Sequence, residues 1–201
     1  MPKQPSDRPR PTLADKYPAL APYEGLIRFV IALLCANYFW KYTVLGDEGG
    51  LGVYWFGLDI TAPFDLLADH IAAAVYGLLQ FFGLDVRLIN DTTMRFTETG
   101  TGIRIVWSCT ALKQSFIWLV IILAARGPWR QKAWFIPMGW LCAYLFNILR
   151  LFLIALAMEH HPEWFEMLHT YLFKYLFYGM FFALWVWWDV KYSNVLPRNE
   201  A

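Results

Sequence analysis

Charged residues are scarce in this 201-residue chain. Asp, Glu, Lys and Arg together make up 16% of the sequence, whereas an ordinary soluble domain contains about 25%. Neither sign is in excess, because 17 basic residues stand against 16 acidic ones and the net charge is +1. The chain therefore lacks the basic surface with which proteins bind phosphate backbones, and we expect no nucleic-acid partner.

Cysteine is also rare, and its spacing excludes a disulfide or zinc framework. The three cysteines, Cys35, Cys109 and Cys142, are odd in number and form no Cys-x-x-Cys pair. The N-terminus has no signal-peptide pattern, because residues 1–24 are polar and Pro-rich without a small-residue cleavage site. We expect these residues to form a flexible cytoplasmic tail.

Apolar and aromatic residues are abundant instead. The sequence is 58% hydrophobic, with 16 Phe, 11 Trp and 11 Tyr, and a chain of this length has too small an interior to bury them all. A membrane-spanning helix needs about 20 mostly apolar residues, and four segments qualify: 25–45, 107–125, 133–158 and 168–188. We expect an all-α integral membrane protein with one membrane-embedded domain over residues 25–190 and a cytoplasmic tail over 191–201.

A fifth apolar segment, residues 64–82, has an amphipathic pattern. Asp65, Asp69 and Gln80 fall on one side of a helix, and Phe64, Ile71 and other apolar residues fall on another. This pattern favours a helix lying along the membrane interface. The alternative is a fifth crossing, with the N-terminus outside.

The distribution of basic residues predicts the orientation. Lys and Arg collect in cytoplasmic loops, and here they occur in the N-terminal tail, in the loop 126–132 and in the C-terminal tail. The segment after the first span carries Asp47, Glu48 and Asp59 and no basic residue. Both termini are therefore expected in the cytoplasm if residues 64–82 lie on the outer surface.

A polar stretch with strand character precedes the second span. Residues 86–89 and 94–97 alternate in polarity, and residues 98–102 have turn composition. We expect a small extracytoplasmic β-hairpin within about residues 85–106.

Few ionisable residues lie within the predicted spans, and such residues are usually functional. Cys109 and Lys113 occur early in the second span, Arg150 late in the third, and His169 at the start of the fourth. In the expected orientation all four lie in the outer leaflet.

These residue types can perform acyl transfer. A thiolate attacks carbonyl carbon, and a nearby cation lowers its pKa. If residues 107–125 form one helix, Lys113 shares a face with Cys109. A histidine can move protons, and an arginine that keeps its proton can stabilise an oxyanion or orient substrate. Cys35 and Cys142, which have no charged neighbour within a turn, are expected to pack.

The motifs around these residues resemble those of exosortases and archaeosortases. The segment Trp107-Ser-Cys-Thr-Ala-Leu-Lys113 is similar to the family's cysteine motif, Asn147-Ile-Leu-Arg150 is similar to its Asn-x-x-Arg motif, and His169 matches its histidine position. The resemblance covers about residues 85–190. In two respects the chain departs from the family: Ala111 stands where glycine is common, and the chain is shorter than many members.

The resemblance implies an integral cysteine transpeptidase or peptidase of the inner (cytoplasmic) membrane, with its active site near the extracytoplasmic face. Its substrates would be exported proteins ending in a short motif, a hydrophobic helix and a basic cluster. Cys109 would be the nucleophile, His169 the acid and base, and Arg150 an oxyanion or substrate ligand, with Asn147 and Lys113 in support. The acceptor nucleophile is unknown, membrane lipid surrounds the enzyme, and no cofactor or metal is expected.

Two alternatives remain open. Residues 159–169 contain Glu166 and His169 at the Glu-x-x-His spacing of di-iron sites, as well as His160 and His161. This segment permits a metal- or haem-dependent redox protein, although a second copy of the motif is missing. The second alternative is a non-enzymatic component of membrane assembly or transport.

Overall fold

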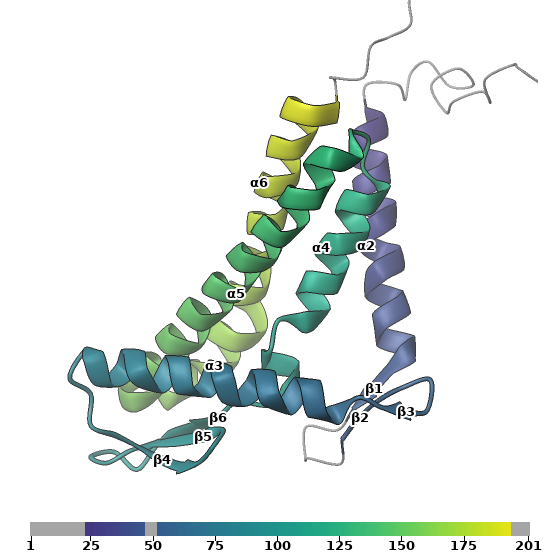
Figure 1. Cartoon of the computed structure of the whole chain (residues 1–201). Helices are drawn as coiled ribbons and strands as arrows, with labels where there is room; N and C mark the ends of the chain where they lie inside the picture. The colour runs from purple at the N-terminus through teal and green to yellow at the C-terminus, as the bar shows by residue number, and fades with distance from the viewer. Residues whose placement is uncertain (1–22, 47–51, 194–201) are drawn as a thin grey trace, which may run out of the picture.

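The computed structural model describes residues 23–46 and 52–193. It consists of a helix bundle and, below it in Figure 1, a layer formed by one further helix and the strands. The predicted tails fall largely outside these ranges, at residues 1–22 and 194–201. α3 (Thr61–Phe81) lies across the lower end of the bundle, together with the strands (Figure 1). The bundle contains four helices: α2 (Glu24–Thr43), α4 (Leu112–Ala124), α5 (Trp129–His160) and α6 (Phe173–Tyr192).

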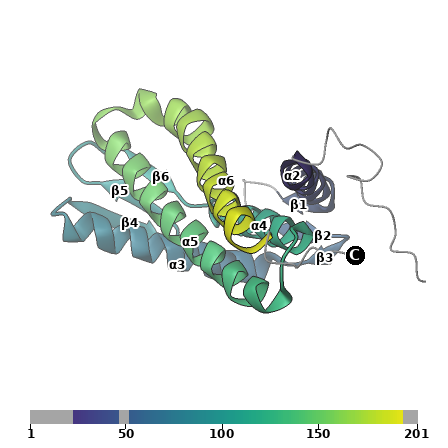
Figure 2. The ribbon, with the colours of Figure 1, turned by 90° about the horizontal axis from the view of Figure 1, so that it is seen from above.

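The bundle helices correspond in sequence to the four predicted spans. Seen from above, α4 lies between α2 and α5, and α6 passes close to α4 (Figure 2). By length and composition, α5 and α3 (Thr61–Phe81) are the two described helices long and apolar enough to cross a membrane. The number of crossings therefore stays a prediction.

α4 is shorter than the predicted second span, and the difference has a local cause. We expected a helix from residue 107, but residues Trp107–Cys109 form a separate 3-10 turn (η3), and Ala111 adopts a left-handed conformation with φ of 60°. Left-handed backbone ends a right-handed helix. The 13 residues of α4 extend only about 20 Å, compared with about 30 Å for the 20 residues of α2.

α3 is amphipathic, as its sequence pattern predicts, and it lies across the bundle rather than along it (Figure 1). Its buried face includes Ile71, Val75 and Leu79, which belong to the same apolar cluster as buried residues of the strands over residues 86–104. Asp65 and Gln80 are exposed on the other side. This direction agrees with the interfacial interpretation of the segment.

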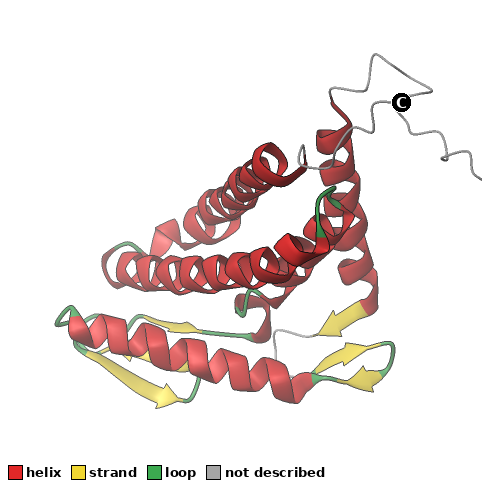
Figure 3. Cartoon of the chain, turned by 45° about the horizontal axis from the view of Figure 1, so that its top comes forward, coloured by secondary structure: helices red, strands yellow, loops and turns green. Residues whose placement is uncertain are grey.

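Two small antiparallel sheets lie at the same end of the molecule as α3 (Figure 3). The sequence indicated a hairpin, and β4 (Val86–Asn90) pairs with β5 (Thr93–Phe96). A third strand, β6 (Gly102–Arg104), which we did not predict, pairs with β5. The other sheet, also unpredicted, consists of β1 (Val44–Gly46), β2 (Val53–Trp55) and β3 (Leu58–Asp59).

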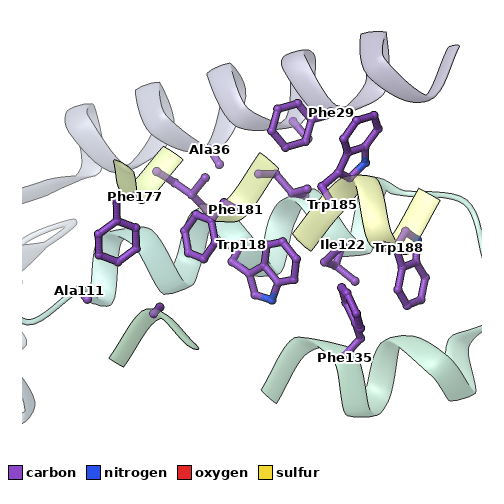
Figure 4. Close-up of a cluster of buried hydrophobic side chains, with 14 of the residues drawn as sticks. Phe29, Ala36, Ala111, Trp118, Ile122, Phe135, Phe177, Phe181, Trp185 and Trp188 are labelled. Carbon is purple, nitrogen blue, oxygen red and sulfur yellow. The ribbon is translucent and has the colours of Figure 1, made fainter. Parts of the chain in front are cut away.

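Two apolar clusters hold these parts together. The first fills the bundle, where aromatic side chains such as Phe29, Trp118, Phe181 and Trp185 interleave (Figure 4). The second joins α3, the β4–β5–β6 sheet and the C-terminal half of α5. Ala111 belongs to the first cluster and Cys109 to the second, so the turn between them connects the two cores.

Polar contacts fix the end of the bundle remote from the sheets. The buried carboxylate of Glu24 accepts hydrogen bonds from Arg28 and Arg126, at 2.7 and 2.6 Å. Lys132 Nζ donates to the carbonyls of Leu123 and Ala125 at 2.9 and 2.6 Å. This ammonium satisfies carbonyls that the end of α4 leaves unpaired.

The bundle exposes many large apolar side chains outside these clusters. On α5 they recur along one side, at Leu141, Leu145, Leu149 and Leu153. Apolar surface of this extent marks contact with a membrane or partner, and the four-residue spacing places it on one helical face.

Candidate active site

The candidate nucleophile lies in a sharp turn at the start of α4. η3 presents Cys109, and Thr110 and the left-handed Ala111 connect it to the helix. The Thr110 hydroxyl donates a hydrogen bond to the Trp107 carbonyl at 2.7 Å, which closes the turn. The Cys109 side chain is 7% exposed, so the turn holds a thiol in a mostly buried position.

Asn147 fixes this turn from α5. Its side-chain amide donates a hydrogen bond to the Cys109 carbonyl at 2.7 Å, and the side chain is fully buried. The sequence predicted a supporting role for Asn147, and the structure assigns its contact to the backbone of the cysteine itself.

Arg150 lies one turn further along α5, on the same side as Asn147. It is 9% exposed and lies within electrostatic range of the Cys109 side chain. Its Nε atom is buried without a hydrogen-bond partner among the described residues. A buried donor of this kind is costly unless something binds it, which makes Arg150 suited to a substrate oxygen.

His169 faces the same site from the segment before α6. We expected it to open a regular helix, but residues Met167–Leu172 form a π-helix (η5). The His169 ring stacks on the Phe165 ring, and their centroids are 5.1 Å apart. Together with Arg150 it lines a cleft of about 290 Å³, the active-site cleft, whose wall also includes Ser108, next to Cys109.

Lys113 is placed differently from the sequence prediction. The expectation that Cys109 and Lys113 share a helix face is wrong, because Ala111 interrupts the helix between them. Lys113 nevertheless lines the active-site cleft, as does Lys174 of α6. The structure thus brings all five predicted site residues to the same end of the bundle.

In the part of the chain that the structure describes, no three His, Cys, Asp or Glu side chains converge, so the metal alternative has no ligand cluster there. His161 instead stacks on Trp164 and contacts Glu163, at 3.0 Å. Hydrogen bonds from its own backbone N–H and from His161 keep the pKa of Glu163 below its ordinary value. This segment forms an exposed connection between α5 and α6.

The comparison with protein families is decisive for the assignment. A model of the transmembrane exosortases matches residues 50–188, which is more than two thirds of the chain. The chain belongs to the transmembrane exosortase family. A search of curated proteins and a search of solved structures each gave no match.

This membership makes the chain an integral membrane protein of a cysteine transpeptidase family. The exosortase match begins upstream of the region over which the motifs showed a resemblance, and it includes α3 as well as the cysteine, arginine and histidine segments.

Sequence reasoning missed two side chains near the exosortase site. Gln114 lines the active-site cleft, with its Oε1 buried and unpartnered among the described residues. Lys41 of α2 lies within electrostatic range of Lys113. Lys41 was overlooked because it ends its span, where a lysine ordinarily extends to the interface, and no sequence pattern distinguishes Gln114.

Proposed function

We propose that this exosortase cleaves C-terminal sorting signals of exported proteins through a thioacyl intermediate on Cys109. The single observation that carries the proposal is the arrangement of the turn: Asn147 holds the Cys109 carbonyl, and Arg150 interacts with Cys109 from the same helix. His169 lines the cleft that Arg150 also lines.

The first half of the reaction forms the thioacyl-enzyme. The Cys109 thiolate attacks the carbonyl carbon of the scissile peptide bond, so that a C–S bond forms and the carbonyl oxygen becomes an oxyanion. The guanidinium of Arg150 stabilises this charge, and removal of such a donor typically costs about 2.7–4 kcal/mol of transition-state stabilisation. When the C–N bond breaks, protonated His169 gives its proton to the leaving amine.

The second half releases the product. An acceptor amine or water gives a proton to neutral His169 and attacks the thioacyl carbon, and the C–S bond breaks to restore the Cys109 thiolate. The acceptor decides between transfer and hydrolysis. The substrate would present a short motif next to its own hydrophobic helix and basic cluster.

The orientation of the chain forms part of the proposal. The start of α2, the α4–α5 loop and the end of α6 lie together at the end of the bundle opposite the sheets (Figure 1). Basic residues collect at that end, including Arg126, Arg130 and Lys191. By the positive-inside rule that end is cytoplasmic, and Cys109 lies toward the extracytoplasmic face.

Co-expression with a protein carrying a tripartite C-terminal signal tests this function. Cys109→Ala should abolish processing, whereas Cys142→Ser, a change on α5 at a cysteine outside the turn, should process normally. Arg150→Lys should be severely impaired, because a point charge does not reproduce the planar fork of a guanidinium. Full processing by a membrane-inserted Cys109→Ala protein would disprove the role of the thiol.

A further inference from the structure

Three lysines from three helices gather around the N-terminal end of α4. Lys113 of α4 lies within electrostatic range of Lys41 of α2 and of Lys174 of α6. Within residues 23–46 and 52–193, no ion pair involves any of them. Cations close together repel one another, so this arrangement is stable when an anion lies among them.

The lysines line two adjacent cavities. The active-site cleft contains Lys113, Lys174 and Arg150, and a neighbouring middle cavity of about 270 Å³ contains Lys41 and Lys113. The two cavities share Ser108, Lys113 and Gln114. None of the described residues that line them is acidic.

An apolar groove adjoins the middle cavity. This groove has a volume of about 550 Å³ and shares Trp40, Val44, Phe64 and Thr110 with the middle cavity. Its lining comes from four helices and includes Phe39, Leu67, Phe116, Leu119 and Trp140. Its lining residues carry no charge, so the lining changes from apolar in the groove to cationic in the other two cavities.

We infer that the apolar groove and the two lysine-lined cavities form a binding site for one phospholipid of the surrounding membrane. One acyl chain occupies the groove, and the headgroup phosphate lies among Lys41, Lys113 and Lys174. Phosphate matches the positive charge, and an acyl chain matches the apolar lining.

The size of the groove fits one acyl chain, because its volume of about 550 Å³ lies within the range of pockets that hold a single small ligand. Lipid binding does not depend on the reactivity of Cys109.

The test uses the full-length Cys109→Ala protein in neutral detergent, with native mass spectrometry and thermal unfolding as readouts. The probe is dioleoyl phosphatidylglycerol; dioleoyl phosphatidylcholine, dioleoylglycerol and free glycerol phosphate serve as comparisons. We expect phosphatidylglycerol to bind and raise the melting temperature. Dioleoylglycerol, which lacks phosphate, and glycerol phosphate, which lacks acyl chains, should each bind at least tenfold more weakly.

Two sets of variants assign the contacts. Lys41→Gln and Lys174→Gln should each weaken phosphatidylglycerol binding about tenfold, the effect of losing one charge-assisted contact. Lys191→Gln removes the same charge from the far end of α6 and should leave binding unchanged. Leu119→Trp should fill the groove and displace the acyl chain of the lipid. If this variant fails to fold, Leu67→Trp tests the same groove from α3.

Several results would overturn the inference. Equal binding of glycerol phosphate would show that the groove is not used, and equal binding of dioleoylglycerol would show that the lysines are not used. An equal loss of phosphatidylglycerol binding in Lys191→Gln would indicate non-specific attraction of the lipid to positive charge. Binding of an acidic peptide in place of phosphatidylglycerol would assign the lysines to a protein partner. Lipid binding without processing by the wild-type chain would contradict only the proposed function.

Discussion

At the scale of single residues, the site depends on how the backbone around Cys109 is held. Cys109 ends a 3-10 turn and lies two residues before the left-handed Ala111, so it does not belong to the regular helix. The Asn147 amide reaches the Cys109 carbonyl across the interface between α5 and the turn. The position of the candidate nucleophile is therefore set by tertiary contact.

Replacement of Asn147 by aspartate should weaken this support. The change keeps the shape of the side chain but places an acceptor against the Cys109 carbonyl. A buried polar group left unsatisfied costs about 1–3 kcal/mol, so the free energy of unfolding should fall by about that amount and processing should slow. Denaturant unfolding and a processing assay measure the two effects.

An exposed hydrogen bond on the same helix provides the control. Gln131 accepts a bond from Trp134 at 2.7 Å on the exposed side of α5. Gln131→Leu should change stability by no more than about 0.5 kcal/mol. Wild-type stability and processing in Asn147→Asp would show that Asn147 does not position the turn.

Ala111→Gly should stabilise the protein. A left-handed conformation costs an ordinary residue roughly 1–2 kcal/mol, and glycine avoids this cost while losing some chain entropy. We expect a net gain of up to about 1 kcal/mol in the free energy of unfolding. Ala73→Gly, on the exposed face of α3, should instead lower it by about 0.5–1 kcal/mol; a loss of stability in both variants would contradict the strain at Ala111.

At the scale of helices and strands, close packing of α4 on α5 depends on a glycine. A Cβ atom on Gly139 would overlap the indole of Trp118, which is fully buried. Gly139→Ala should destabilise the protein by about 1–3 kcal/mol through overpacking. The matched change Gly179→Ala on α6 meets no atom within 4 Å and should be neutral or stabilising in thermal unfolding. Equal melting temperatures for the two variants would contradict this account of the helix contact.

The sequence predicts the regular helices better than the turn that holds Cys109 and Ala111. Long apolar runs located α2, α5 and α6, and the spacing of Asp65, Asp69 and Gln80 gave the exposed side of α3. Ala111 was misplaced within a helix because alanine is the strongest helix former, and only surrounding contacts favour its left-handed conformation. The β1–β2–β3 sheet was missed because its strands are two or three residues long and carry too little periodic signal.

The candidate site was predicted as a list of residues but not as a geometry. Arg150 and Lys113 were selected because ionisable groups within apolar spans are costly, and Asn147 was selected through the resemblance of its motif to that of the exosortases. Their partners depend on how the helices pack: Asn147 contacts the Cys109 backbone, and Lys113 lies near lysines of two other helices. Such contacts between distant segments have no signal in a single sequence.

At the scale of the whole molecule, the proposed orientation can be tested by labelling. Thr99, after β5, and Arg130, in the first turn of α5, are both exposed and lie at opposite ends of the protein. In a background with Cys35, Cys109 and Cys142 replaced by serine, Thr99→Cys should react with an impermeant maleimide in intact spheroplasts. Arg130→Cys should react only after permeabilisation. The reverse pattern would place Cys109 on the cytoplasmic side.

The most direct test of the account is mass spectrometry of the Cys109 peptide after brief co-expression with a tripartite substrate. The account predicts an acyl adduct on the Cys109 sulfur that carries the substrate sequence up to the cleavage point and is released by hydroxylamine. The same adduct should be absent from Cys35 and Cys142. Processing at the wild-type rate with no trace of this thioester, or with the adduct on another residue, would contradict the account.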